Sequence, residues 1–276
     1  MKKFLFFFVF YAAFVSSGFD ENNSLIKYYG KSKNQINIVI KDNIDIEGEV
    51  TSAGSLALEK NIAPKNAFIV QKLIDANFHI AGKANLSEWA NFRSEDSVSG
   101  WSSYGGQTTH FLNNSFNPCG SSSGSAVAVA AGIVDIAIGT ETNGSISCPS
   151  SINGIVGFKP TVGLVSRSGI VPISSTQDTA GPMGNSVELV AKTLEAIAGY
   201  DPLDSSTAAI PEKLNFNFSK DLKSSSIAGK RFAILQSDTK DELMKPLIDE
   251  IKTILQNNGA VLVEIDDIRE YPGEDE

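Results

Sequence analysis

The chain has 276 residues, of which 42% are hydrophobic and 20% are charged, a composition typical of a folded protein with a sizeable core. The net charge of −9, with no cluster of lysine and arginine, argues against a nucleic-acid partner, because phosphate binding depends on such clusters. Two cysteines and two histidines are too few and too scattered for a disulfide framework or a metal motif, so we expect no metal site.

The N-terminus differs in character from the rest of the chain. Lys2 and Lys3 precede an apolar run over residues 4–15, and the small residues 16–18 follow it. This order predicts a signal peptide over residues 1–18 and a secreted or periplasmic protein, with no membrane span after its removal. The alternative is a buried or membrane-tethering helix, although the run is too short to cross a bilayer comfortably.

The first half of the remaining chain, after a polar segment over 20–35, predicts alternating strands and helices. Residues 36–40 form a β-branched run that ends at Lys41 and predicts a buried strand. Apolar residues at helical spacing predict a helix over 66–76, and a short strand over 78–81 follows. Residues 97–125 are rich in Ser, Gly and Asn and predict a loop.

The second half continues the alternation. Small apolar residues predict a helix over 126–133, and strands are predicted over 135–139 and 155–158. Ser186 is the predicted N-cap of an amphipathic helix over 186–198, and residues 201–226 predict a loop. A strand–helix–strand unit is predicted over 231–235, 241–256 and 261–265, with Pro246 shifting the helix start. The pattern predicts an α/β fold with a mixed, mostly parallel β-sheet flanked by helices.

Three segments contain residues suited to chemistry, although each alone has a simpler interpretation. Lys41 ends a hydrophobic strand, where it either reaches water as a surface lysine or stays buried with a lowered pKa. The segment PCGSSSGSAVAVAAG (118–132) is either a flexible Ser/Gly loop or a set of donors leading into a helix. The segment GTETNGSISCPS (139–150) predicts a tight turn whose backbone amides converge beside Ser145, as an oxyanion hole requires.

Together these segments resemble the amidase-signature family, and most closely its peptide-amidase-like branch. The resemblance covers about residues 36–198 and includes KDNID, AGKANLSEWANFR, GWSSYGGQT and the block from GSSSGSAVAVAAG to TQDTAGPM. It implies the amidase-signature fold over residues 19–276. It also implies that Ser145 is the nucleophile, Ser121 the bridging serine after a cis peptide bond and Lys41 the base. The backbone amides of residues 142–145 (Thr142, Asn143, Gly144 and Ser145) would form the oxyanion hole.

The implied activity is hydrolysis of a carboxylic amide, in a small molecule or a peptide, through an acyl-enzyme on Ser145. Lysine replaces the more usual histidine, and the proton passes from Ser145 to Ser121 to Lys41 without a cofactor. Cys119 and Cys148 each lie within three residues of a predicted catalytic serine, and one disulfide between them is the alternative to two separate thiols. We nevertheless expect two buried thiols.

The chain departs from the family pattern at two residues and in length. The family often has Gly at position 143 and Arg at position 147, where this chain has Asn143 and Ser147. The family domain is longer at both ends, so we expect a shortened fold whose C-terminal part is missing. Such a fold would leave a sheet edge exposed for a partner. The alternative function is therefore that of a truncated, inactive amidase-like protein that only binds or is a remnant.

Two other enzyme motifs are weaker. Residues 120–124 satisfy the G-x-S-x-G pattern of α/β-hydrolases, but no strand precedes them and both histidines lie upstream of the segment. Residues 154–161 do not have the spacing of a phosphate-binding loop. Neither motif competes with the combined signal of Lys41, Ser121 and Ser145.

Overall fold

A computed structural model describes residues 20–211, 214–235 and 242–265, and the chain divides into two units, residues 1–219 and residues 220–276. The predicted signal peptide lies outside the described residues. Within the described segments, no helix combines the length and the apolar character needed to cross a bilayer.

The first unit contains most of the strands and helices. Its strands are β1 (Leu25–Tyr28), β2 (Ile36–Lys41), β3 (Phe78–Ala84), β4 (Trp101–Ser102), β5 (Gly106–Gln107), β6 (Ile136–Glu141), β7 (Val156–Gly157) and β8 (Thr179–Gly184). Its α-helices are α1 (Phe68–Asp75), α2 (Ser123–Ala130), α3 (Ser147–Ile152) and α4 (Val187–Ile197). Short 3₁₀ helices occur at Leu56–Leu58, Glu88–Asn91 and Ser205–Ala209.

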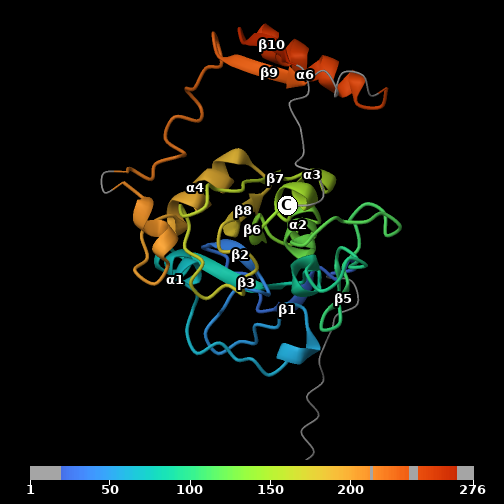
Figure 1. The fold of residues 1–276 in the computed structure, drawn as a ribbon, viewed down its shortest axis with the longest axis vertical. Helices are drawn as coiled ribbons and strands as arrows, with labels where there is room; N and C mark the ends of the chain where they lie inside the picture. Colours follow the sequence, from blue (N-terminus) through green and yellow to red (C-terminus); the bar gives the residue numbers. More distant parts are fainter. Residues whose placement is uncertain (1–19, 212–213, 236–241, 266–276) are drawn as a thin grey trace, which may run out of the picture. The chain divides into compact units, whose positions relative to one another are not determined.

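The main sheet has six strands in the order β1-β3-β2-β6-β8-β7 (Figure 1). Its central strands are parallel, because β2 pairs in parallel with both β3 and β6. The outer strands are antiparallel: β1 pairs with β3, and β8 pairs with β6 and β7. The prediction of a mixed α/β fold is confirmed, and parallel pairing brings the C-terminal ends of β2 and β6 to the same edge of the sheet.

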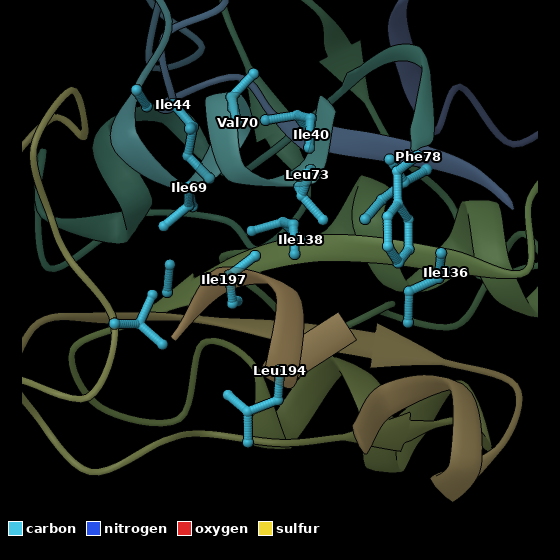
Figure 2. Packing of buried hydrophobic residues seen from close by; sticks show 14 of the residues in the cluster. Ile40, Ile44, Ile69, Val70, Leu73, Phe78, Ile136, Ile138, Leu194 and Ile197 are labelled. Carbon is cyan, nitrogen blue, oxygen red and sulfur yellow. The ribbon is translucent and has the colours of Figure 1, made fainter. Parts of the chain in front are cut away.

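The two faces of this sheet are covered by different helices. Because successive side chains point to opposite faces of a sheet, each central strand packs against helices on both sides. Ile38 and Ile40 of β2 belong to a cluster with residues of α1 and α4, whereas Val39 packs in a second cluster with residues of α2. Figure 2 shows the first cluster, in which Leu73 and Ile197 lie near Ile40 and Ile138. The sheet is therefore covered on both faces, and β2 is buried between them.

Apart from the short β4–β5 pair and the 3₁₀ helices, three elements of this unit, β1, β8 and α3, were not predicted from the sequence. β8 contains two glycines and a proline, which disfavour strands. At Gly181 an added Cβ would lie 2.2 Å from the Phe158 carbonyl oxygen and 2.8 Å from Pro160 Cδ, so the segment that follows β7 leaves room only for glycine there. α3 contains Pro149, which is tolerated in the first turn of a helix, where its missing N–H has no intrahelical partner. β1 lies within the polar segment 20–35, for which the sequence predicts no strand, and it forms by pairing with β3.

The second unit is the predicted strand–helix–strand unit. It consists of β9 (Arg231–Leu235), α6 (Lys245–Asn257) and β10 (Val261–Ile265), and the two strands pair in parallel. Pro246 lies in the first turn of α6, so the helix begins later than residue 241. Residue 241 itself is outside the described residues. Both strand predictions match the observed bounds.

Candidate active site

Lys41 is completely buried at the C-terminal end of β2, with none of its surface exposed. Its Nζ lies 2.8 Å from Ser121 Oγ, 2.9 Å from Ser122 Oγ and 2.9 Å from Thr140 Oγ1. The Thr140 carbonyl oxygen is 3.2 Å away. The sequence left open whether Lys41 is exposed or buried, and the structure shows that it is buried. The hydroxyl groups around it come from residues 121–122 and from Thr140.

Burial lowers the pKa of Lys41 to about 7, and the negative charges of Glu141 and Asp178 oppose this shift. The ammonium form loses its hydration in the interior, so the neutral amine is favoured. Near neutral pH a large fraction of Lys41 is therefore uncharged and has a lone pair available to accept a proton. This is the protonation state that a general base requires.

The hydrogen bonds around Lys41 indicate which hydroxyl its lone pair faces. Ser122 Oγ donates to the Thr140 carbonyl oxygen at 3.1 Å, so its hydrogen is already used and it accepts from Lys41. Thr140 supplies the acceptor for the second N–H of the neutral amine. The lone pair is then left for the hydroxyl of Ser121.

Ser121 and Ser122 precede α2, in the loop predicted from the sequence. The Gly120–Ser121 peptide bond is cis, in agreement with the resemblance. Both serines are fully buried. Ser122 N–H donates to the carbonyl oxygen of Ser145 at 3.2 Å, so the segments that carry Ser121 and Ser145 lie side by side.

Ser145 follows the turn between β6 and α3 and is buried, with 8% of its surface exposed. Gly144 has a φ of +80°, a conformation that favours glycine. The Thr142 hydroxyl donates to Asp178 Oδ1 at 2.5 Å. The other carboxylate oxygen, Asp178 Oδ2, accepts the backbone N–H groups of Ile173 and Ser174. Asp178 therefore fixes one end of the turn predicted to form the oxyanion hole.

Glu141 fixes the other end of that turn. Its Oε2 accepts the backbone N–H groups of Ile146 at 2.7 Å and Ser147 at 2.9 Å. Burial alone would raise the pKa of Glu141, but hydrogen bonds from the amides of Ser147, Ile146 and Gly144 outweigh it and lower the pKa. Where the family often has arginine, the Ser147 hydroxyl also donates to Glu141, at 3.2 Å. The serine found at position 147, in place of the family's frequent arginine, therefore has a hydrogen-bond partner in Glu141.

A buried ion pair lies next to the site. Lys83 Nζ of β3 is 2.7 Å from Asp42 Oδ1, and both side chains are at most 2% exposed. Asp42 also accepts the Ser52 hydroxyl, and Lys83 donates to the Val50 carbonyl oxygen at 2.5 Å. Burial raises the pKa of the Asp42 carboxyl and the Lys83 ammonium opposes that shift. Removing one partner of such a pair typically costs about 3–5 kcal/mol, so the pair anchors the residue that follows Lys41.

The two cysteines form a disulfide, so the expectation of two separate thiols is wrong. Cys119 and Cys148 are joined with their Cα atoms 6.0 Å apart. Cys119 lies just before Ser121, in a left-handed conformation with a φ of +57°, and Cys148 lies in the first turn of α3. Local sequence contains no measure of the distance between them, which is set by packing of the Ser121 and Ser145 segments.

Two pockets lie beside these segments. The first has a volume of about 280 Å³ and is lined by residues that include Thr140, Thr142 and Asp178. The second has a volume of about 300 Å³ and an aromatic wall of Trp89 and Phe92. Both pockets are also lined by Asn43 and by residues 171–173. The first pocket therefore lies at the end of β6, and neither Ser121 nor Ser145 is among the residues that line the two pockets.

Comparison with known proteins identifies a family. The model of the amidase family matches residues 23–271. This chain belongs to the amidase family. A protein of Arabidopsis thaliana named as a probable amidase is 41% identical over 228 residues, which cover 82% of this chain and 43% of that protein. The chain spans 40–43% of the length of the first three curated relatives it matches.

Solved structures lead to the same family. The peptide amidase of Stenotrophomonas maltophilia is 46% identical, with a TM-score of 0.84 over 90% of this chain and 55% of that one. An amidase family protein of Bacillus anthracis is 40% identical, with a TM-score of 0.80 over 86% of this chain and 48% of that one. The resemblance to the amidase-signature family, with a peptide amidase among its members, is confirmed.

The site contains residues that sequence reasoning did not single out. Ser122 and Thr140 complete the surroundings of Lys41, while Glu141 and Asp178 fix the turn before Ser145. Ser122 stands in a run of three serines, which offered no means of choosing between them. Thr140 and Glu141 lie just beyond the strand predicted over 135–139 and end the observed β6, a position that marks a functional edge only once the neighbouring strands are known.

Proposed function

We propose that this chain hydrolyses a carboxylic amide through an acyl-enzyme formed on Ser145. The observation that carries the proposal is the buried Lys41, whose pKa is lowered to about 7 and whose Nζ lies 2.8 Å from Ser121 Oγ. A base with this pKa is suited to catalysis near neutral pH. The segment of Ser121 is hydrogen-bonded to that of Ser145, which supports a relay between the two hydroxyls.

In the proposed mechanism Lys41 accepts a proton from Ser121 as Ser121 accepts one from Ser145. The Ser145 oxygen attacks the amide carbon, and the negative charge on the carbonyl oxygen is stabilised by backbone amides of residues 142–145. The proton returns through Ser121 to the leaving nitrogen, and water hydrolyses the acyl-enzyme. This chemistry needs no metal or cofactor.

The proposed substrate class is a peptide that carries a C-terminal carboxamide. Support comes from the Stenotrophomonas maltophilia peptide amidase, which is 46% identical to this chain. A panel of peptide amides, aryl amides, fatty amides and small aliphatic amides will identify the class by ammonia or amine release. If none of these amides is hydrolysed, the proposal is contradicted, and the alternative of a protein that only binds is favoured.

The three residues are expected to act as a unit. Ser145→Ala should abolish acyl-enzyme formation, and Lys41→Ala should lower kcat by roughly 10²- to 10⁴-fold near pH 7 because the base is lost. Since Lys41 and Ser121 share one proton path, the Lys41→Ala/Ser121→Ala double variant should be hardly slower than the worse single variant. Steady-state kinetics and mass spectrometry of the trapped acyl-enzyme measure both effects, and strictly additive losses would contradict the relay.

We also propose that the protein is exported. The charged start, the apolar run of residues 4–15 and the small residues that follow are typical of a signal peptide. The Cys119–Cys148 disulfide is of the kind that persists in oxidising compartments. N-terminal sequencing of the protein from the culture medium or periplasm should give a start near residue 19. An uncleaved chain in the cytoplasm would contradict export and leave the proposed activity untouched.

A further inference from the structure

The turn before Ser145 contains an exposed Asn–Gly pair, Asn143 and Gly144. Residues 142–144 belong to neither a helix nor a strand, and within the described part of the chain the Asn143 side chain has no hydrogen bond. Gly144 has a φ of +80°, and a Cβ added there would meet no atom beyond its chain neighbours within 4 Å. The Asn143 carboxamide is therefore free to turn, and the space around the next residue is open.

Two other Asn–Gly pairs in the sequence provide a comparison within the same molecule. Asn153 is 3% exposed, and its Nδ2 donates to two backbone carbonyl oxygens at 2.9 Å each. Asn258 is exposed, and its Nδ2 donates to one carbonyl oxygen, that of Ile254, at 2.8 Å. The three carboxamide groups are thus held to different degrees, least at Asn143 and most at Asn153.

An asparagine followed by glycine loses ammonia without an enzyme, because glycine has no Cβ to obstruct the attack. The backbone nitrogen of Gly144 bonds to the side-chain carbonyl carbon of Asn143, and the bond from that carbon to Nδ2 breaks. The Gly144 nitrogen gives up its proton towards the Glu141 carboxylate, to which its N–H is hydrogen-bonded. The side-chain nitrogen gains one proton and leaves as ammonia. Water, the sole co-reactant, then opens the cyclic imide at one of its two carbonyl carbons, which gives aspartate or isoaspartate.

We propose that Asn143 is a site of spontaneous deamidation, which ends the activity of each molecule in which it occurs. The modification depends on the turn alone, whereas the loss of activity rests on the proposed function. Isoaspartate inserts one additional methylene group into the backbone two residues before Ser145, so the amides of the turn lose their positions. It also adds a negative charge beside the place where the oxyanion forms. Displacing an oxyanion donor lowers kcat by roughly 10²- to 10³-fold, so a modified molecule is in effect inactive.

The test is incubation of the intact, unreduced protein at mildly alkaline pH, followed by digestion and mass spectrometry. Replacement of the amide by a carboxyl group raises the mass of the peptide that carries residue 143. We expect conversion to be fastest at Asn143, slower at Asn258 and slowest at Asn153, by roughly fivefold for each hydrogen bond that must open. The remaining amidase activity should equal the fraction of Asn143 that is unmodified.

Two variants separate the chemistry from its consequence, and each is compared with its own activity before incubation. Asn143→Gln keeps a carboxamide but requires a larger ring to lose ammonia, so its starting activity should persist through the same incubation. Asn258→Gln, at the exposed pair of the second unit, is the matched control. It should lose activity as fast as the unaltered protein.

Three results would overturn the proposal. The first is conversion at Asn143 that is no faster than at Asn153. The second is activity that persists after Asn143 has been converted, and the third is a loss of activity in Asn143→Gln at the rate of the unaltered protein. A protein with no starting activity contradicts the proposed function instead, and the peptide masses then decide whether Asn143 is modified.

Discussion

At the scale of single residues, the chemistry depends on the environment of one lysine. Lys41 is surrounded by oxygen atoms of Ser121, Ser122 and Thr140, and no oppositely charged group is among these hydrogen-bond partners. An ammonium ion buried in this way has lost water without gaining a counter-ion in direct contact, which explains why its pKa falls. Glu141 and Asp178 are near enough to moderate the shift.

This environment predicts a pH profile. Because the pKa of Lys41 is lowered to about 7, kcat/KM for an amide should rise with pH through about 7 as the amine loses its proton, and level off above. Glu141→Gln removes a negative charge that raises the pKa, so the midpoint should move to lower pH. Initial rates between pH 5 and pH 9 measure both profiles. A midpoint that stays in place in Glu141→Gln, or a flat profile in the unaltered protein, would contradict this assignment.

At the scale of elements, two segments that carry the serines are joined by several links. The loop before α2 and the start of α3 are connected by the Ser122–Ser145 backbone hydrogen bond and by the Cys119–Cys148 disulfide. Asn153 Nδ2 adds a hydrogen bond to the Pro118 carbonyl oxygen at 2.9 Å. The two serines are therefore positioned by a local assembly rather than by the sheet alone.

The disulfide should contribute to this assembly measurably. Its cysteines are 29 residues apart, and closing a loop of this size stabilises a fold by about 3–4 kcal/mol in the chain-entropy description. We expect Cys119→Ser to lower the free energy of unfolding by about that amount. The Cys119→Ser/Cys148→Ser double variant should lose no more, because one bond is removed in each case. Urea unfolding of the single and double variants measures these losses.

Two controls accompany this measurement. The unreduced protein should be about two daltons lighter than the reduced protein, since each disulfide removes two hydrogens. Treatment with a reductant should destabilise the unaltered protein and leave the double variant unchanged. Identical masses before and after reduction would restore the interpretation of two separate thiols.

At the scale of the whole molecule, the second unit has little core of its own. Leu247, Ile251 and Ile254 of α6 are between 38% and 53% exposed, and no residue of this helix is buried. Its sheet has two strands, so in the described part of the chain each strand has an unpaired edge. Exposed apolar faces and open strand edges promote association.

We therefore expect the chain made alone to bind a hydrophobic dye and to self-associate. Leu247→Lys/Ile254→Lys should lower dye fluorescence and shift light scattering toward the monomer, because the apolar face of α6 becomes charged. Leu112→Lys, at a position in the first unit that is 75% exposed, is the matched control and should change neither signal. A monomeric chain that binds no dye and unfolds cooperatively would show that this expectation is wrong.

Elements with a local pattern could be predicted from the amino-acid order alone. The β-branched run before Lys41 predicted β2, and helical spacing with Ser186 as N-cap predicted α4, whose cap is observed. β9 and β10 were predicted with their observed bounds because each is a short apolar run bounded by polar or turn residues. The roles of Lys41, Ser121 and Ser145 came from family resemblance, since no local rule selects one serine among several.

Features that depend on residues distant in the chain emerged only from the folded arrangement. The hydrogen-bond partners of Lys41 lie 80 to 99 residues away, so neither its burial nor its lowered pKa could be read from KDNID. β8 is a strand although its glycines and proline disfavour one, because it pairs with β6 and β7. Its glycines are required by close neighbours, such as the Phe158 carbonyl oxygen at Gly181. The disulfide likewise exists only where two segments meet. Propensity acts over a few residues, whereas burial and electrostatics depend on what the fold brings together.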